Sequence, residues 1–99
     1  MKKVIISQPM SDKTKEEILE IRAKAIESAK NKLGEDIEII YSYIQDAPEG
    51  VNALWFLGKF IQLLSEADYM YLAPGWEDYR GCRVERLAAI EYCVEIIHG

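Results

Sequence analysis

Residues 3 to 9 read Lys3-Val4-Ile5-Ile6-Ser7-Gln8-Pro9, a short β-branched run that is followed by a turn. The run has no helical spacing, which predicts a buried strand that ends at Gln8-Pro9. A helix is expected next, because Thr14 with Glu17 three residues later fits a capping box. Its apolar residues repeat at helical spacing and are Ile18, Ile21, Ala25 and Ala29. The helix is expected to end at Gly34.

The same alternation between strand-like runs and helical spacing of apolar residues recurs along the rest of the chain. Strands are predicted at Ile37 to Tyr41, Tyr69 to Ala73 and Val94 to Ile97. The second helix is predicted from the helical spacing of Leu54, Leu57, Ile61 and Leu64. The third helix is expected after Gly81 and carries Val84, Ala88 and Tyr92. Strands that alternate with helices in this way predict right-handed crossovers and a parallel sheet that is covered on both faces. We therefore expect a three-layer α/β fold, with about four parallel strands alternating with three helices.

Composition and charge narrow the class of protein. The 99 residues are 49% hydrophobic and 29% charged, which predicts one compact domain over residues 1–99. The net charge of −5 argues against binding to a nucleic acid duplex or to an anionic membrane. No signal peptide or membrane span is visible, so a cytoplasmic protein is expected. Cys82, Cys93 and His98 have no metal-ligand spacing, so no metal site is predicted.

Parallel sheets bind ligands at the carboxyl ends of their strands, which directs attention to the loops after Ser7, Tyr41 and Ala73. The first loop, Ser7 to Ser11, offers hydroxyls, an amide and backbone N–H groups ahead of a helix. Such a loop can hold anions and sugar hydroxyls, although Ser11 or Thr14 could simply cap the helix. Neither a dinucleotide-binding glycine motif nor a P-loop is present.

The third loop concentrates charge around the start of the third helix. Three arginines and three carboxylates lie between Glu77 and Arg86. Glu85 falls about one turn into the helix, where its carboxylate could project over the edge of the sheet. There it could attack an anomeric carbon or stabilise positive charge on a sugar. The alternative is a solvated helix glutamate that is loosely paired with Arg83 or Arg86.

An ordered set of motifs resembles the small nucleoside 2-deoxyribosyltransferase-like proteins of bacteria and phages. The resemblance covers nearly the whole chain, and its most specific part is the last motif. The motifs are Ile6-Ser7-Gln8-Pro9-Met10, Leu54-Trp55-Phe56-Leu57-Gly58-Lys59, Ala67-Asp68, Gly75-Trp76-Glu77 and Arg80-Gly81-Cys82-Arg83-Val84-Glu85.

This resemblance implies a Rossmann-like or flavodoxin-like sheet, a homo-oligomer, and cleavage or exchange of the N-glycosidic bond of a 2-deoxyribonucleoside or its monophosphate. Glu85 would be the nucleophile, and Arg80 or Arg83 would hold any phosphate. No metal or organic cofactor is implied, and Asp68 would lie just before a strand in a structural or binding role. The remaining substrate-binding residues would be Ser7, Gln8, Pro9, Met10, Gly75, Trp76, Tyr79, Gly81 and Arg83.

The chain also departs from the pattern of these relatives. They tend to carry an aspartate at position 41, a serine at 60, a small residue at 79, a histidine at 86 and a glycine at 93. This chain has Tyr41, Phe60, Tyr79, Arg86 and Cys93 at those positions. The active transferases place an acidic residue at the position of Tyr79, so Asp78 or Glu77 would have to replace it.

Two further hypotheses follow from these departures. The first is a natural or deliberately altered, non-catalytic version of the scaffold that binds a protein partner through Tyr41, Phe60, Tyr79 and Arg86, residue types that anchor interfaces. The second is a nucleotide-sensing domain that binds without turnover. The second helix is apolar nearly all round, which indicates that it is covered on two sides, by a partner or by a homodimer seam and the sheet.

Overall fold

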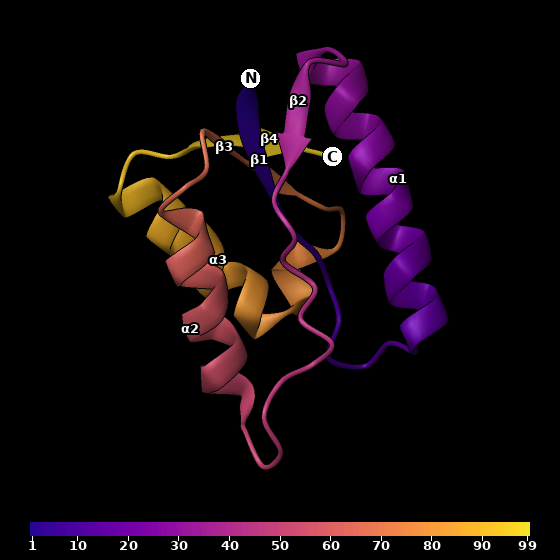
Figure 1. The fold of residues 1–99 in the computed structure, drawn as a ribbon, viewed down its shortest axis with the longest axis vertical. Helices are drawn as coiled ribbons and strands as arrows, with labels where there is room; N and C mark the ends of the chain where they lie inside the picture. The colour runs from indigo at the N-terminus through magenta and orange to yellow at the C-terminus, as the bar shows by residue number, and fades with distance from the viewer.

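The computed structural model describes residues 1–99 and contains one four-stranded sheet with helices on both faces (Figure 1). All strand pairs are parallel, and the strand order is β2-β1-β3-β4. The expected three-layer α/β fold of Rossmann-like or flavodoxin-like type is confirmed. In chain order the elements are β1 (Lys2–Ser7), α1 (Lys15–Leu33), β2 (Ile37–Ile39), α2 (Ala53–Leu64), β3 (Tyr69–Leu72), the 3-10 helix η1 (Trp76–Asp78), α3 (Arg80–Glu91) and β4 (Glu95–His98).

The central strands β1 and β3 end at the same level of the sheet. Ser7 pairs with Leu72, and Leu72 pairs with His98 on β4. From β1 the chain continues to α1 and β2, whereas from β3 it continues to α3 and β4 on the opposite side. The strand order therefore reverses between β1 and β3, and sheets of this kind bind ligands in the crevice at such a point.

Alternation along β1 divides the core into two layers. Val4 and Ile6 pack in the layer of α1, whereas Ile5 packs in the layer of α2 and α3. Figure 1 shows α1 alone on one side of the sheet and the other two helices together on the opposite side. Ser7 lies two residues after Ile5 and therefore faces the layer of α3 as well. This register brings a hydroxyl group to the carboxyl edge of the sheet on the side of α3.

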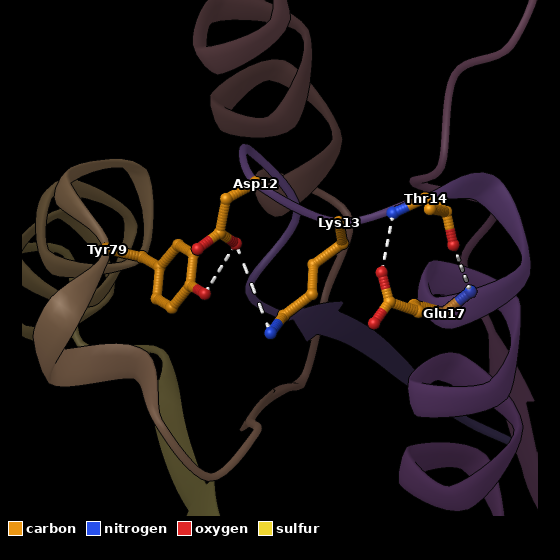
Figure 2. Close-up of polar contacts among 5 residues, drawn as sticks. All are labelled: Asp12, Lys13, Thr14, Glu17 and Tyr79. Atoms are coloured by element: carbon orange, nitrogen blue, oxygen red, sulfur yellow. Dashed lines mark hydrogen bonds and ion pairs between the residues drawn. The ribbon is translucent and has the colours of Figure 1, made fainter.

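Helix α1 begins and ends where the sequence predicts. Thr14 Oγ1 accepts a hydrogen bond from the Glu17 amide at 3.1 Å, and Glu17 Oε1 accepts one from the Thr14 amide at 2.9 Å. This reciprocal pair is the expected capping box (Figure 2). Gly34 follows the helix with a φ of 95°, a conformation that side chains other than glycine rarely adopt.

The buried faces of α2 and α3 differ from those expected. In α2, Phe60 and Leu64 are buried, whereas Leu54 is 72% exposed and Ile61 also faces outward. In α3, Cys82 and Ala89 are buried, whereas Val84 and Tyr92 are exposed. The physical reason is that both helices carry apolar residues on more than one side. Their sequence spacing therefore does not decide which side meets the sheet.

The strand ends differ slightly from the prediction. β2 ends at Ile39 rather than Tyr41, although the Ile40 amide still donates to Val4 O at 2.8 Å. The chain passes from α3 to β4 through Cys93, whose φ of 60° lies in the left-handed region. Glycine is the residue that adopts this conformation most readily, and it is also the residue expected at position 93 from the resemblance.

Helices α2 and α3 pack against each other and leave six large apolar side chains partly exposed. Each of these six residues is between 37% and 72% exposed. They are Leu54, Phe56, Ile61, Val84, Leu87 and Ile90. The homo-oligomer expected from the resemblance stays a prediction. None of the helices has the length and apolar composition that crossing a membrane requires.

The two phenylalanines of α2 provide a stability test of this packing. Phe60 is 6% exposed and Phe56 is 41% exposed. We expect Phe60→Ala to lower the free energy of unfolding by about 3–5 kcal/mol, because it opens a cavity in the core. Phe56→Ala, the matched control, should lower it by about 1 kcal/mol or less. Urea denaturation measures both, and equal effects would contradict the assigned orientation of α2.

Candidate functional site

A cleft of about 790 Å³ lies at the carboxyl edge of the sheet. Its walls come from the loop after β1, the loop after β2, helix α2 and the first turns of α3. Twelve of its eighteen lining residues are hydrophobic, so its surface suits a flat apolar group more than a highly charged one. The lining residues are Gln8, Met10, Ser11, Ile18, Ser42, Tyr43, Ile44, Ala53, Leu54, Phe56, Leu57, Phe60, Tyr79, Arg80, Gly81, Cys82, Val84 and Glu85.

Glu85 is the carboxylate of this cleft. The spacing of Cys82, Glu85 and Ala89 places these three residues on the face of α3 that meets the sheet. Ser7 Oγ, at the end of β1, donates a hydrogen bond of 2.6 Å to Glu85 Oε1. Burial raises the pKa of Glu85 to about 7, and the hydrogen bond from Ser7 partly opposes this rise. Glu85 is therefore held in place by Ser7 and is not the loosely paired surface glutamate of the alternative interpretation.

Cys82 lies beside this pair and is not a candidate nucleophile. Its side chain is 3% exposed, and burial raises the pKa of its thiol to about 11. The thiolate is the reactive form of cysteine, so Cys82 remains a protonated packing residue near neutral pH.

The start of α3 contributes a cation and free backbone donors to the cleft. No side chain caps this helix end, and both Arg80 and Gly81 line the cleft. Arg80 is exposed and takes part in no ion pair. Arg83 instead turns away and donates from Nη1 to Glu77 O at 2.7 Å. Of the two arginines proposed for a phosphate, Arg80 is therefore the one that lines the cleft.

The side-chain amide of Gln8 forms a hydrogen bond through only one of its two polar atoms. Its Nε2 donates to Ile18 O at 2.9 Å, which fixes the orientation of the amide. Its Oε1 is buried and has no hydrogen-bond partner. A buried acceptor without a partner is unfavourable by about 1–3 kcal/mol. Because Gln8 lines the cleft, a donor group of a ligand could bond this acceptor.

Tyr79 closes one side of the cleft by reaching across to the loop after β1 (Figure 2). Its hydroxyl donates to Asp12 Oδ1 at 2.6 Å. This hydrogen bond raises the pKa of Tyr79, so the hydroxyl keeps its proton and remains a donor. The Lys13 ammonium lies 4.0 Å from Asp12 Oδ1 and 5.8 Å from the centre of the Tyr79 ring.

The wall formed by the loop after β2 contains no residue that the sequence predicts as part of the site. Ser42, Tyr43 and Ile44 line the cleft there. Arg22 on α1 anchors this loop, because it donates to Ser42 Oγ at 3.2 Å and to Ile40 O at 3.1 Å. Partial burial lowers the pKa of Arg22. Arg22 is one of several charged residues along α1, and its partial burial is visible only in the folded structure, so no sequence signal identifies this contact.

The structure brings most of the expected substrate-binding residues together, but not all. Gln8, Met10, Tyr79, Gly81 and Glu85 line the cleft, and Ser7 is bonded to Glu85. Four residues were expected to line the site and do not: Pro9, Gly75, Trp76 and Arg83.

Three of these four residues make packing contacts outside the lining of the cleft. Gly75 adopts a φ of 88°, and a Cβ atom at this position would lie 3.8 Å from Pro9 Cγ, in ordinary contact. Trp76 is covered by the guanidinium of Arg86, which lies 4.9 Å from the ring centre. Asp68 accepts a hydrogen bond from the Lys3 amide at 2.8 Å, which gives it a structural role at the opposite end of the strands.

The residues expected to form a partner-binding patch do not share one exposed surface. Phe60 is buried in the core and therefore cannot anchor a partner, which corrects that expectation. Arg86 is half-buried against Trp76, and Tyr79 belongs to the main cleft. Tyr41 is 55% exposed and lines a second cleft of about 590 Å³ beside Trp55 and Lys59. The acidic residues Glu77 and Asp78 lie on η1 and do not line the main cleft.

Comparison with known proteins gives no further assignment. No protein-family model matches the chain, and no curated protein matches it.

The raised pKa of Glu85 makes the stability of the protein depend on pH. The folded state binds the Glu85 proton more tightly than the unfolded state does, so stability falls as the pH rises from about 4.5 to about 7. This effect is at most about 3 kcal/mol. Glu85→Gln keeps an acceptor for Ser7 and carries no charge, so the variant should be more stable than the wild type at pH 8.

Urea denaturation at pH 5 and pH 8 measures this difference. Glu91→Gln, which removes an exposed carboxylate of the same helix, is the matched control. A wild-type advantage over Glu85→Gln at pH 8 would contradict the assigned burial of the carboxylate.

Proposed function

We propose that this protein cleaves or exchanges the N-glycosidic bond of a 2-deoxyribonucleoside or of its 5′-monophosphate, with Glu85 as the nucleophile. The observation that carries the proposal is the partly buried Glu85 carboxylate, fixed by Ser7 in the wall of a largely apolar cleft. The ordered motifs that resemble nucleoside 2-deoxyribosyltransferase-like proteins support the same reaction.

The chemistry needs one carboxylate oxygen for attack and the other for orientation. Ser7 holds Glu85 Oε1, which leaves Oε2 to attack the anomeric carbon of the sugar. The new bond joins carbon and Oε2, the carbon–nitrogen bond breaks, and its electron pair leaves with the base, which takes a proton from solvent. Water, or a second base in an exchange, then displaces Glu85. Desolvation makes this carboxylate more basic than an exposed one, which favours its role as a nucleophile.

The rest of the cleft suits the other parts of such a substrate. Tyr43, Phe56 and Phe60 are aromatic members of a lining against which a base can pack. Arg80 and the uncapped start of α3 are placed to attract a 5′-phosphate. Apolar walls discriminate weakly between bases of similar size, so the proposed enzyme accepts more than one base.

The two alternative functions separate in the same assay. A nucleotide sensor would bind the substrates without releasing the base. A protein-binding scaffold would do neither, and it has lost the support of Phe60, which is buried.

The first functional test follows base release from a panel of 2-deoxyribonucleosides and 5′-monophosphates by chromatography. Glu85→Gln should reduce the rate by a factor of about 10³ or more, because the amide cannot form the glycosyl bond. Glu91→Gln should retain the activity. In the wild type, kcat should rise as the pH passes through about 7, since the ionised form of Glu85 attacks. Full activity in Glu85→Gln would remove the proposal.

A second test concerns the phosphate. Arg80→Ala should raise KM for a 5′-monophosphate about tenfold or more, the loss expected of a charge-assisted contact, and leave KM for the nucleoside nearly unchanged. Arg83→Ala is the matched control, since Arg83 bonds Glu77 O outside the cleft. The same rise for both substrates would show that Arg80 does not read the phosphate.

A further inference from the structure

The cleft lies between two loops that lead to opposite layers of the fold. The loop after β1 leads to α1, and the segment with η1 leads to α3. Each loop supplies lining residues: Met10 and Ser11 come from the first, and Tyr79 and Arg80 come from the second. No backbone hydrogen bond joins residues 8–13 to residues 75–81. A side-chain hydrogen bond joins them, from the Tyr79 hydroxyl to Asp12 Oδ1.

We propose that Asp12 is a positioning residue, which acts through Tyr79 to hold one wall of the cleft in place for the substrate. We call the pair the Asp12–Tyr79 latch. The proposal rests on the proposed function, because it assigns a role in substrate binding to two residues of that site.

The geometry of the latch favours a positioning role over a helix cap. Tyr79 immediately precedes α3, yet its side chain does not cap that helix. It crosses to the opposite loop instead, and Figure 2 shows the ring and the Asp12 carboxylate reaching toward each other from the two loops. The bond of 2.6 Å joins a neutral donor to a charged acceptor, which makes it stronger than a bond between neutral groups.

The surroundings fix Asp12 in turn. Lys13 places its ammonium near both latch residues. The capping box of Thr14 and Glu17 begins α1 directly afterwards, so the loop that carries Asp12 is tied to the end of a long helix. The Tyr79 ring is therefore held from a rigid element on the other side of the cleft.

The consequence for binding is preorganisation. A ring that is already fixed loses no further freedom when a substrate packs against it, whereas a free ring must be ordered on binding. Loss of the latch should therefore raise KM by about three- to tenfold and leave kcat nearly unchanged, because Tyr79 does not act on the reacting bond.

The experiment is a double-mutant cycle with Tyr79→Phe, Asp12→Ala and the combined variant. Tyr79→Phe removes only the hydroxyl, and the Asp12 side chain is 67% exposed, so the fold should tolerate both changes. Each single variant should show the rise in KM, and the combined variant should be no worse than either one. Tyr92→Phe and Asp36→Ala, at exposed positions without hydrogen bonds from these side chains, are the matched controls.

A second measurement does not depend on catalysis. The Lys13 amide donates to Met10 O at 3.0 Å within the loop that the latch restrains. Its hydrogen exchange should become about two- to fivefold faster in Tyr79→Phe and in Asp12→Ala, the range expected for an exposed charged contact. Exchange in β1 and β3 should not change.

These two measurements separate the latch from the proposed function. Faster exchange together with a raised KM supports the proposal. Additive effects in the cycle, a loss of kcat with KM unchanged, or unaltered exchange would overturn it. If the wild type neither binds nor cleaves any nucleoside, the proposed function fails and the substrate role of the latch fails with it; the exchange result then decides whether the two loops are coupled.

Discussion

The hydrogen bond between Ser7 and Glu85 joins the central strand β1 to α3 and positions the one carboxylate that lines the cleft. Its position follows from the register of β1, because Ser7 faces the same layer as Ile5. The same apolar packing that orders α3 against the sheet also removes water from Glu85. The packing of α3 against the sheet therefore has two effects. It stabilises the fold, and it makes the charged form of Glu85 unfavourable.

At position 85, the residue that would best stabilise the fold differs from the residue that the proposed reaction requires. An uncharged residue at position 85 would suit the core better near neutral pH, whereas attack on a sugar requires the charge. The unpaired Oε1 of Gln8 adds a second unfavourable group to the lining of the same cleft. The opposite end of the strands differs, because Asp68 accepts a backbone hydrogen bond there.

Sequence patterns predicted the features that depend on interactions between residues close together in the chain. The Thr14 and Glu17 capping box and the helix end at Gly34 were found where short-range spacing put them, and the strands were found within two residues of their predicted bounds. The inward faces of α2 and α3 were not, because a helix that is apolar on several sides can pack in more than one rotation. For Glu85, the distance from the start of the helix allowed the observed placement but also allowed a solvated side chain, and only the structure separates the two. The bonds from Arg22 to Ser42 and from Tyr79 to Asp12 join distant parts of the chain, and no local pattern encodes such partners.

Ser7 and Glu85 lie 78 positions apart in the chain, which has a consequence for how the site comes into being. During synthesis, β1 leaves the ribosome long before α3. The Ser7 hydroxyl is therefore hydrated first and forms its hydrogen bond with Glu85 only later. The cleft cannot assemble in stages alongside β1 and α1, because two of its walls arrive with α2 and α3. A ligand for this cleft therefore recognises a chain that has already folded, and it stabilises that state without guiding the early steps of folding.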